Sequence, residues 1–114
     1  MIIAFTAQGT EMKSPVDPRF GRSSYFILYD EKTDQISIID NTEVDNLSHG
    51  AGPKTAQKLI EAKVDILITG NGPGGNAARV LKETGIRTYT GAGEMSVEEA
   101  FRAYNQSKLK EFTF

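Results

Sequence analysis

The side chains best suited to chemistry in this sequence are gathered in the stretch DPRFGRSSYF, which begins at Asp17. Arg19 and Arg22 lie on either side of the pair Phe20-Gly21, directly before a run of strand-forming residues. A guanidinium group is a planar donor that matches a carboxylate, a phosphate or the face of an anionic cluster. The structural alternative is that one arginine pairs with Asp17 and stiffens the loop, while Phe20 packs into the core. Both interpretations stay open at this point.

His49 is the only histidine, and it lies in SHGAGP just before a predicted helix. A neutral imidazole can bind a metal ion. A protein metal site normally takes three or four side chains, so an exposed loop histidine is the alternative. A preassembled cluster that brings its own ligands needs fewer. One histidine with nearby amides and guanidinium groups, or two histidines of a homodimer, could hold such a cluster.

The glycine-rich segment GNGPGG, from Gly70 to Gly75, lies between a predicted strand and a predicted helix. It contains the spacing G-x-G-x-x-G, but the next strand lacks the acid that binds ribose, and the Gly-Lys-Ser/Thr ending of a phosphate loop is missing. The free amides at the start of the following helix favour an anion there, and a tight strand-to-helix turn is the alternative. We expect no catalytic residue. The expected ligand contacts are Asp17, Arg19, Phe20, Gly21, Arg22, Gly50, Gly52, Gly72, Gly74, Gly75 and Asn76, with His49 as the metal ligand.

Composition narrows the classes of partner. The 114 residues, 39% of them hydrophobic, predict one domain spanning residues 1–114. The net charge of −2 comes without a run of one sign, so neither nucleic acid nor an anionic membrane is an expected partner. Cysteine is absent, which excludes disulfides and any thiolate-bound iron–sulfur or zinc site supplied by this chain alone. The first residues lack a basic leader and a long apolar run, so we expect a cytoplasmic protein.

The elements that must position these groups begin with three predicted strands. Ile2–Phe5 and Tyr25–Tyr29 are continuous apolar runs, typical of strands that are covered on both faces. Gln35–Asp40 begins as an alternation of polar and apolar residues after a polar turn. The second and third strands therefore form a predicted hairpin, with the third strand nearer an edge of the sheet.

Helices and strands alternate after Gly52. Pro53 suits the first position of a helix that ends before the strand Val64–Ile68. A second helix ends at Gly85, and the strand Ile86–Thr90 follows. The sequence SVEE, from residue 96, predicts a capping box at the start of a third helix. The final SKLKEFTF either extends that helix or packs back through its two phenylalanines.

The order βββαβαβα predicts an α/β fold of the ribonuclease H-like type, with a mixed five-stranded sheet and three helices. The loops that carry the candidate residues then meet at one edge of the sheet, where ligands of open α/β sheets bind. A nuclease of this architecture needs converging carboxylates, typically one of them on the first strand. The strand IIAFTA has none, and Asp65 lies at the opposite end of its strand. The nuclease interpretation is therefore poor.

Three segments, VDPRFGRSSYF, HGAGPKTAQKL and GNGPGGNAARVL, occur in this order over nearly the whole chain. Together they resemble the dinitrogenase iron-molybdenum cofactor biosynthesis family. The resemblance implies a small carrier that holds iron–sulfur or iron–molybdenum clusters during nitrogenase cofactor assembly. In the nitrogenase carriers a histidine implicated in cofactor binding stands where this chain has Arg19, so the best ligand of that motif is absent here.

The leading hypothesis is a non-enzymatic carrier for an iron–sulfur or iron–molybdenum-type cluster, bound transiently, with cofactor-assembly proteins as partners of a monomer or homodimer. The alternative is an interaction module that binds an anion or metabolite without metal. A metal-dependent hydrolase ranks third, because the required carboxylates are missing.

Overall fold

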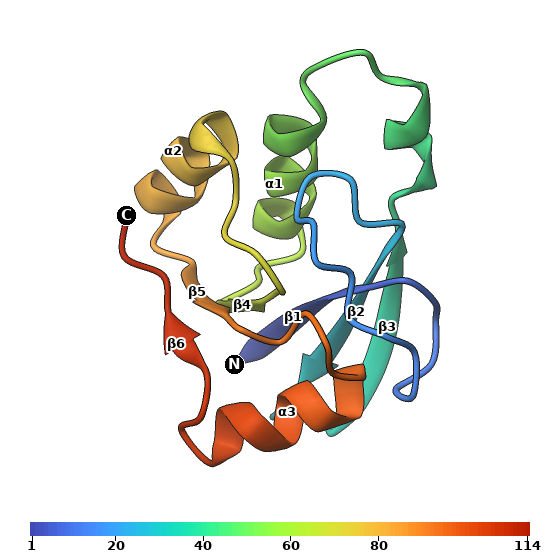
Figure 1. Cartoon of the computed structure of the whole chain (residues 1–114), viewed down its shortest axis with the longest axis vertical. Helices are drawn as coiled ribbons and strands as arrows, with labels where there is room; N and C mark the ends of the chain where they lie inside the picture. The colour runs from blue at the N-terminus through green and yellow to red at the C-terminus, as the bar shows by residue number, and fades with distance from the viewer.

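The computed structural model describes residues 1–114 as a mixed sheet covered by helices on both faces (Figure 1). The elements in chain order are β1 Ile2–Ala7, β2 Tyr25–Asp30, β3 Gln35–Asp40, the 3-10 helix η1 Thr42–Asn46, α1 Ala51–Glu61, β4 Ile66–Ile68, α2 Gly75–Thr84, β5 Arg87–Thr90, α3 Val97–Asn105 and β6 Lys110–Glu111. The predicted succession of five strands and three helices is present. No helix is long and apolar enough to cross a membrane.

The sheet has six strands in the order β3-β2-β1-β4-β5-β6, so the predicted count of five is wrong. β1, β4 and β5 are parallel, and β2 is antiparallel to both β1 and β3, as expected from the connections. The additional strand, β6, pairs antiparallel with β5. It forms because β5 would otherwise leave an unpaired edge, and the C-terminal segment turns back after α3 to cover it.

The two faces of the sheet belong to separate core layers. α1 and α2 cover one face, and α3 covers the other (Figure 1). Successive residues of β1 alternate between the layers: Ala4 contacts the α1/α2 side, whereas Ile3 and Phe5 contact the α3 side. This double coverage explains why β1 is apolar throughout. β3 lies at the edge as predicted, and Ile36 there is 50% exposed.

Helix termini follow local sequence signals closely. α2 ends at Gly85, which has the left-handed φ of 77°, and Ser96 forms the predicted capping box with Glu99. The prediction for Pro53 is off by two positions, because α1 already begins at Ala51 after the left-handed Gly50. The shift costs no hydrogen bond, since the first-turn amides of a helix have no intrahelical acceptor in any case.

Candidate functional site

A cleft of about 360 Å³ opens where the first turns of α1 and α2 meet the loop between β1 and β2. It is lined by Arg19, Gly21, Arg22, Gly50, Ala51, Gly52, Pro53, Gly74, Gly75, Asn76 and Ala77. The three motif segments therefore meet in one concave site. Eight of the residues expected from the sequence line it.

Both helices present uncapped N-termini to this cleft. The N-cap residues are Gly50 for α1 and Gly74 for α2, and neither helix has a capping side chain or an acidic residue in its first turn. In α3, by contrast, the Ser96 hydroxyl accepts a hydrogen bond from the amide of Glu99. The first turns of α1 and α2 thus keep free N–H groups, and the helix dipole adds partial positive charge at the same place.

Close backbone approach between three segments brings these termini together. A Cβ atom at Gly21 would lie 2.9 Å from the Cα of Gly52, and a Cβ atom at Gly52 would lie 3.1 Å from that of Ala77. The loop before β2 therefore packs directly on α1, and α1 packs directly on α2. Small residues at these positions serve contact between segments, which is their clearest role here.

The loop between β4 and α2 is held against the first motif as well. A Cβ atom at Gly70 would lie 2.6 Å from the Cα of Pro18, and the amide of Asn71 donates a 2.8 Å hydrogen bond to the Pro18 carbonyl. The glycine-rich segment and the DPRFG segment are thus one rigid unit at the edge of the sheet.

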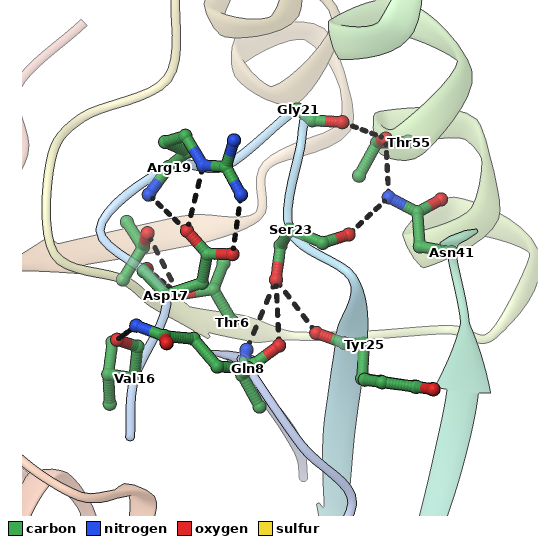
Figure 2. Close-up of polar contacts among 12 residues, drawn as sticks. Thr6, Gln8, Val16, Asp17, Arg19, Gly21, Ser23, Tyr25, Asn41 and Thr55 are labelled. Atoms are coloured by element: carbon green, nitrogen blue, oxygen red, sulfur yellow. Dashed lines mark hydrogen bonds and ion pairs between the residues drawn. The ribbon is translucent and has the colours of Figure 1, made fainter. Parts of the chain in front are cut away.

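Asp17 is a structural residue rather than a free ligand. Its side chain is 2% exposed and accepts hydrogen bonds from the Arg19 amide at 2.9 Å and from the Arg19 Nε and Nη2 atoms, each at 3.2 Å (Figure 2). This contact raises the pKa of Arg19 above its ordinary value, chiefly through the hydrogen bond to Asp17. The structural pairing considered for the first motif therefore forms with Arg19, and Asp17 neutralises much of the charge that Arg19 brings to the cleft.

Of the two arginines in the cleft, Arg22 is the one without a carboxylate partner. Its Nη1 atom donates a 2.7 Å hydrogen bond to the carbonyl of Val44 in η1, a neutral acceptor. Its charge is therefore not cancelled by a salt bridge, and its remaining N–H groups are the strongest side-chain donors in the cleft. On these grounds Arg22 outranks Arg19 as a ligand for an anion.

A buried polar network fixes the loop that carries Arg22 (Figure 2). The Thr55 hydroxyl donates to the Gly21 carbonyl at 2.9 Å and accepts from Asn41 Nδ2 at 3.0 Å. The same Asn41 amide group donates to the Ser23 carbonyl at 2.9 Å. Thr55 is on α1 and Asn41 follows β3, so the network ties the loop to two elements.

Four expected site residues lie outside the lining of the cleft. Asp17 is buried beneath Arg19, and Phe20 is in the α1/α2 core layer, where it contacts Phe26 edge-on at 5.8 Å between ring centroids. Gly72 is covered by the ring of Phe112. His49 is exposed on the loop before α1. No three His, Cys, Asp or Glu side chains lie together as a metal-ligand group.

Sequence reasoning missed three lining residues and the network behind them. Ala51, Pro53 and Ala77 line the cleft because they belong to the first turns of the two helices. The proline signal for a helix start could have identified the turn of α1. The hydrogen bond between Asn41 and Thr55 has no comparable signal in the sequence, because only the fold brings these two residues together.

Comparison with known proteins assigns the family. The family model for the dinitrogenase iron-molybdenum cofactor matches residues 1–107. The chain belongs to this family. The match includes all three motif segments and every element from β1 to α3, so the family relation extends over the whole cleft. No curated protein sequence gives a comparable match.

Solved structures agree with the family assignment. The apo form of the orange protein from Desulfovibrio gigas is 32% identical, with a TM-score of 0.92 over 98% of this chain and 92% of that chain. A protein from Thermotoga, solved by NMR, is 35% identical, with a TM-score of 0.83 over 99% of this chain and 97% of its own. PH0822 is 26% identical, with a TM-score of 0.74 and coverages of 98% and 96%.

Proposed function

We propose that this protein is a non-enzymatic carrier that holds an anionic metal cluster of the iron–sulfur or iron–molybdenum type in the cleft between α1 and α2. The observation that carries the proposal is the pair of uncapped helix N-termini, both without acidic residues, that open on one cleft beside Arg22. Membership of the dinitrogenase iron-molybdenum cofactor family supports a cluster as cargo.

The chemistry of the cleft suits a cluster that arrives with its own ligands. Amides and a guanidinium group can donate hydrogen bonds to the sulfur or oxygen atoms of such a cluster, but they form no bond to a metal. The only histidine, His49, is a single exposed side chain beside the N-cap Gly50. In this proposal it adds at most one metal bond to cargo that the cleft has already bound.

The expected affinity for an anion follows from the hydrogen-bond donors that line the cleft. Each helix N-terminus contributes roughly 0.3 to 1 kcal/mol toward an anion, and a charge-assisted hydrogen bond from Arg22 roughly 1.5 to 3 kcal/mol. After the entropy of association, a small anion such as phosphate should bind with a Kd on the order of millimolar. A cluster presents more acceptor atoms at once and should bind more tightly.

The remaining parts of the proposal describe the setting of this carrier. Cofactor-assembly proteins are the proposed partners, the cargo is transient, and the protein acts in the cytoplasm as a monomer or homodimer. The second candidate is an anion- or metabolite-binding module, and the observation that favours it is the absence of a three-residue metal-ligand group.

The test is an anaerobic titration of the protein with a preformed iron–sulfur cluster, followed by visible absorption and by co-elution on gel filtration. Arg22→Ala should weaken binding about tenfold or more, because it removes a charge-assisted donor. Arg102→Ala is the matched control, since Arg102 lies on α3 and is 61% exposed. A metal bond from His49 predicts that His49→Ala weakens cluster binding but leaves phosphate binding unchanged.

The two candidates separate in the same experiment. Binding of phosphate at the cleft without binding of a cluster supports the metabolite module. If neither ligand binds, or if Arg22→Ala binds as well as the wild type, the cleft is not the proposed site.

A further inference from the structure

We infer that the C-terminal segment 108–114 is a latch that holds the glycine-rich loop before α2 in position, with Phe112 as the positioning residue for the anion cleft. The inference rests on the proposed function, since it concerns how firmly the α2 N-terminus is held for its ligand. The segment lies beyond residues 1–107, the part that the family model matches.

Several contacts fasten this segment to the sheet. β6 pairs with β5, and the amide of Phe112 donates a 2.7 Å hydrogen bond to the Thr88 carbonyl. Arg87 and Glu111 form a two-point ion pair, with N–O distances of 3.1 and 3.2 Å. The tail then continues to the C-terminus beside α2 (Figure 1). Its course is therefore set by backbone and side-chain contacts on β5.

Phe112 is seated on the glycine-rich loop. A Cβ atom at Gly72 would lie 2.7 Å from the ring atom Cδ2 of Phe112 and 3.2 Å from Cζ, so the ring occupies the space of a side chain at that position. Phe112 and Gly75, the first residue of α2, also line one shallow groove of about 320 Å³. The ring thus contacts the loop at Gly72 and faces the groove that leads to the start of α2.

The loop is consequently clamped from two sides. Pro18 contacts Gly70 and accepts the amide of Asn71 on one side, and Phe112 covers Gly72 on the other. The free amides of the first turn of α2 follow directly after this clamped loop. A binding group that is already fixed loses less entropy when the ligand arrives, so the latch raises affinity without touching the anion.

Phe112→Ala removes the ring, and Lys110→Ala is the control, because Lys110 lies on the same segment, is exposed and lines neither the cleft nor the groove of Phe112. The readout is a titration with inorganic phosphate, followed through the amide NMR signals of Gly75 and Asn76. We expect Phe112→Ala to weaken phosphate binding roughly threefold to tenfold, the loss expected when one fixed group becomes mobile. Lys110→Ala should bind like the wild type.

A double-mutant cycle separates positioning from general damage to the fold. Gly72→Ala places a methyl group against the ring and should weaken binding as Phe112→Ala does. With the ring removed, the three atoms nearest to the methyl group are gone, so the double variant should bind no more weakly than Phe112→Ala alone. Independent, additive losses from the two substitutions would overturn the latch.

Hydrogen exchange tests the latch without any ligand. In Phe112→Ala the amide of Asn71 should exchange faster, because the loop that holds its hydrogen bond to Pro18 is loosened on one side. Unchanged exchange together with unchanged phosphate affinity would refute the inference. If neither phosphate nor a preformed cluster binds the wild type, the proposed function fails, and faster exchange at Asn71 still supports the positioning role of Phe112.

Discussion

A single substitution at the start of α2 should move stability and binding in opposite directions. Gly74 is the N-cap of α2 and has the extended backbone, φ −67° and ψ 168°, that suits an N-cap aspartate. A Cβ atom there meets no other atom within 4 Å. Gly74→Asp therefore adds a carboxylate at the helix N-terminus without a steric cost.

The expected gain in stability is about 1 kcal/mol. Aspartate exceeds glycine as an N-cap by a few tenths of a kcal/mol, and a negative charge at a helix N-terminus adds about 0.3 to 1 kcal/mol. For a domain of this size, 1 kcal/mol raises Tm by about 4 °C. Thermal and urea unfolding measure this gain directly.

The expected effect on the ligand has the opposite sign. The new carboxylate takes the same free amides and repels an anion, which together cost about 1 to 3 kcal/mol of binding free energy. Affinity for phosphate and for a preformed cluster should fall by about fivefold to about 150-fold. Gly74→Ala is the control, because it adds a methyl group but no charge, and its affinity should change less than twofold.

Stability and anion affinity are to be measured on the same Gly74→Asp protein, because their combination distinguishes the possible causes of a change. A loss of both stability and binding would mean that Gly74→Asp distorts the helix start. A Gly74→Asp protein that binds anions as tightly as the wild type would show that the α2 N-terminus is not the anion site, and the proposed function would then fall.

Four further substitutions test the packing behind the cleft and the capping box of α3. Gly21→Ala should cost about 1 to 3 kcal/mol in urea unfolding, because its methyl group meets backbone of α1, whereas Gly75→Ala meets nothing and should leave stability unchanged or raise it. Thr55→Val should lower the free energy of unfolding by about 1 to 3 kcal/mol, since it leaves buried polar partners unsatisfied, and an unchanged free energy of unfolding would contradict the role of the network. The backbone hydrogen bond from Ser96 lowers the pKa of Glu99 below its ordinary 4.5, so the stability it contributes is present above that pH and is lost as pH falls through the lowered value. Glu99→Gln removes the titrating carboxylate and should flatten this acid limb of the stability curve, and an unaltered curve would refute the assignment.

Much of the fold follows from local patterns in the sequence. Apolar runs predict β1 and β2, a capping box predicts the start of α3, and Gly85 predicts the end of α2. Each signal lies within a few neighbouring residues, so it survives any change in distant contacts. β6 escaped prediction because a two-residue strand is defined by its partner, β5, and not by its own composition.

The candidate site was predictable in outline only. The connections alone place the motif loops at one edge of the sheet, and eight expected residues do line the cleft. Sequence reasoning could not rank Arg22 above Arg19, because that ranking depends on which arginine reaches the buried carboxylate of Asp17. It also placed Gly72 at the ligand, whereas the ring of Phe112 covers it.

By itself the sequence determined the order of strands and helices, the family and the absence of acidic residues and side-chain caps at two helix starts. Only the tertiary structure decided that these two N-termini share one cleft and that the ring of Phe112 packs on Gly72, in the loop between β4 and α2. The physical reason is the separation along the chain over which each kind of interaction acts. Propensity and capping act between neighbours in the chain, whereas the contacts of Gly21 with Gly52 and of Gly72 with Phe112 exist only after distant segments have packed together.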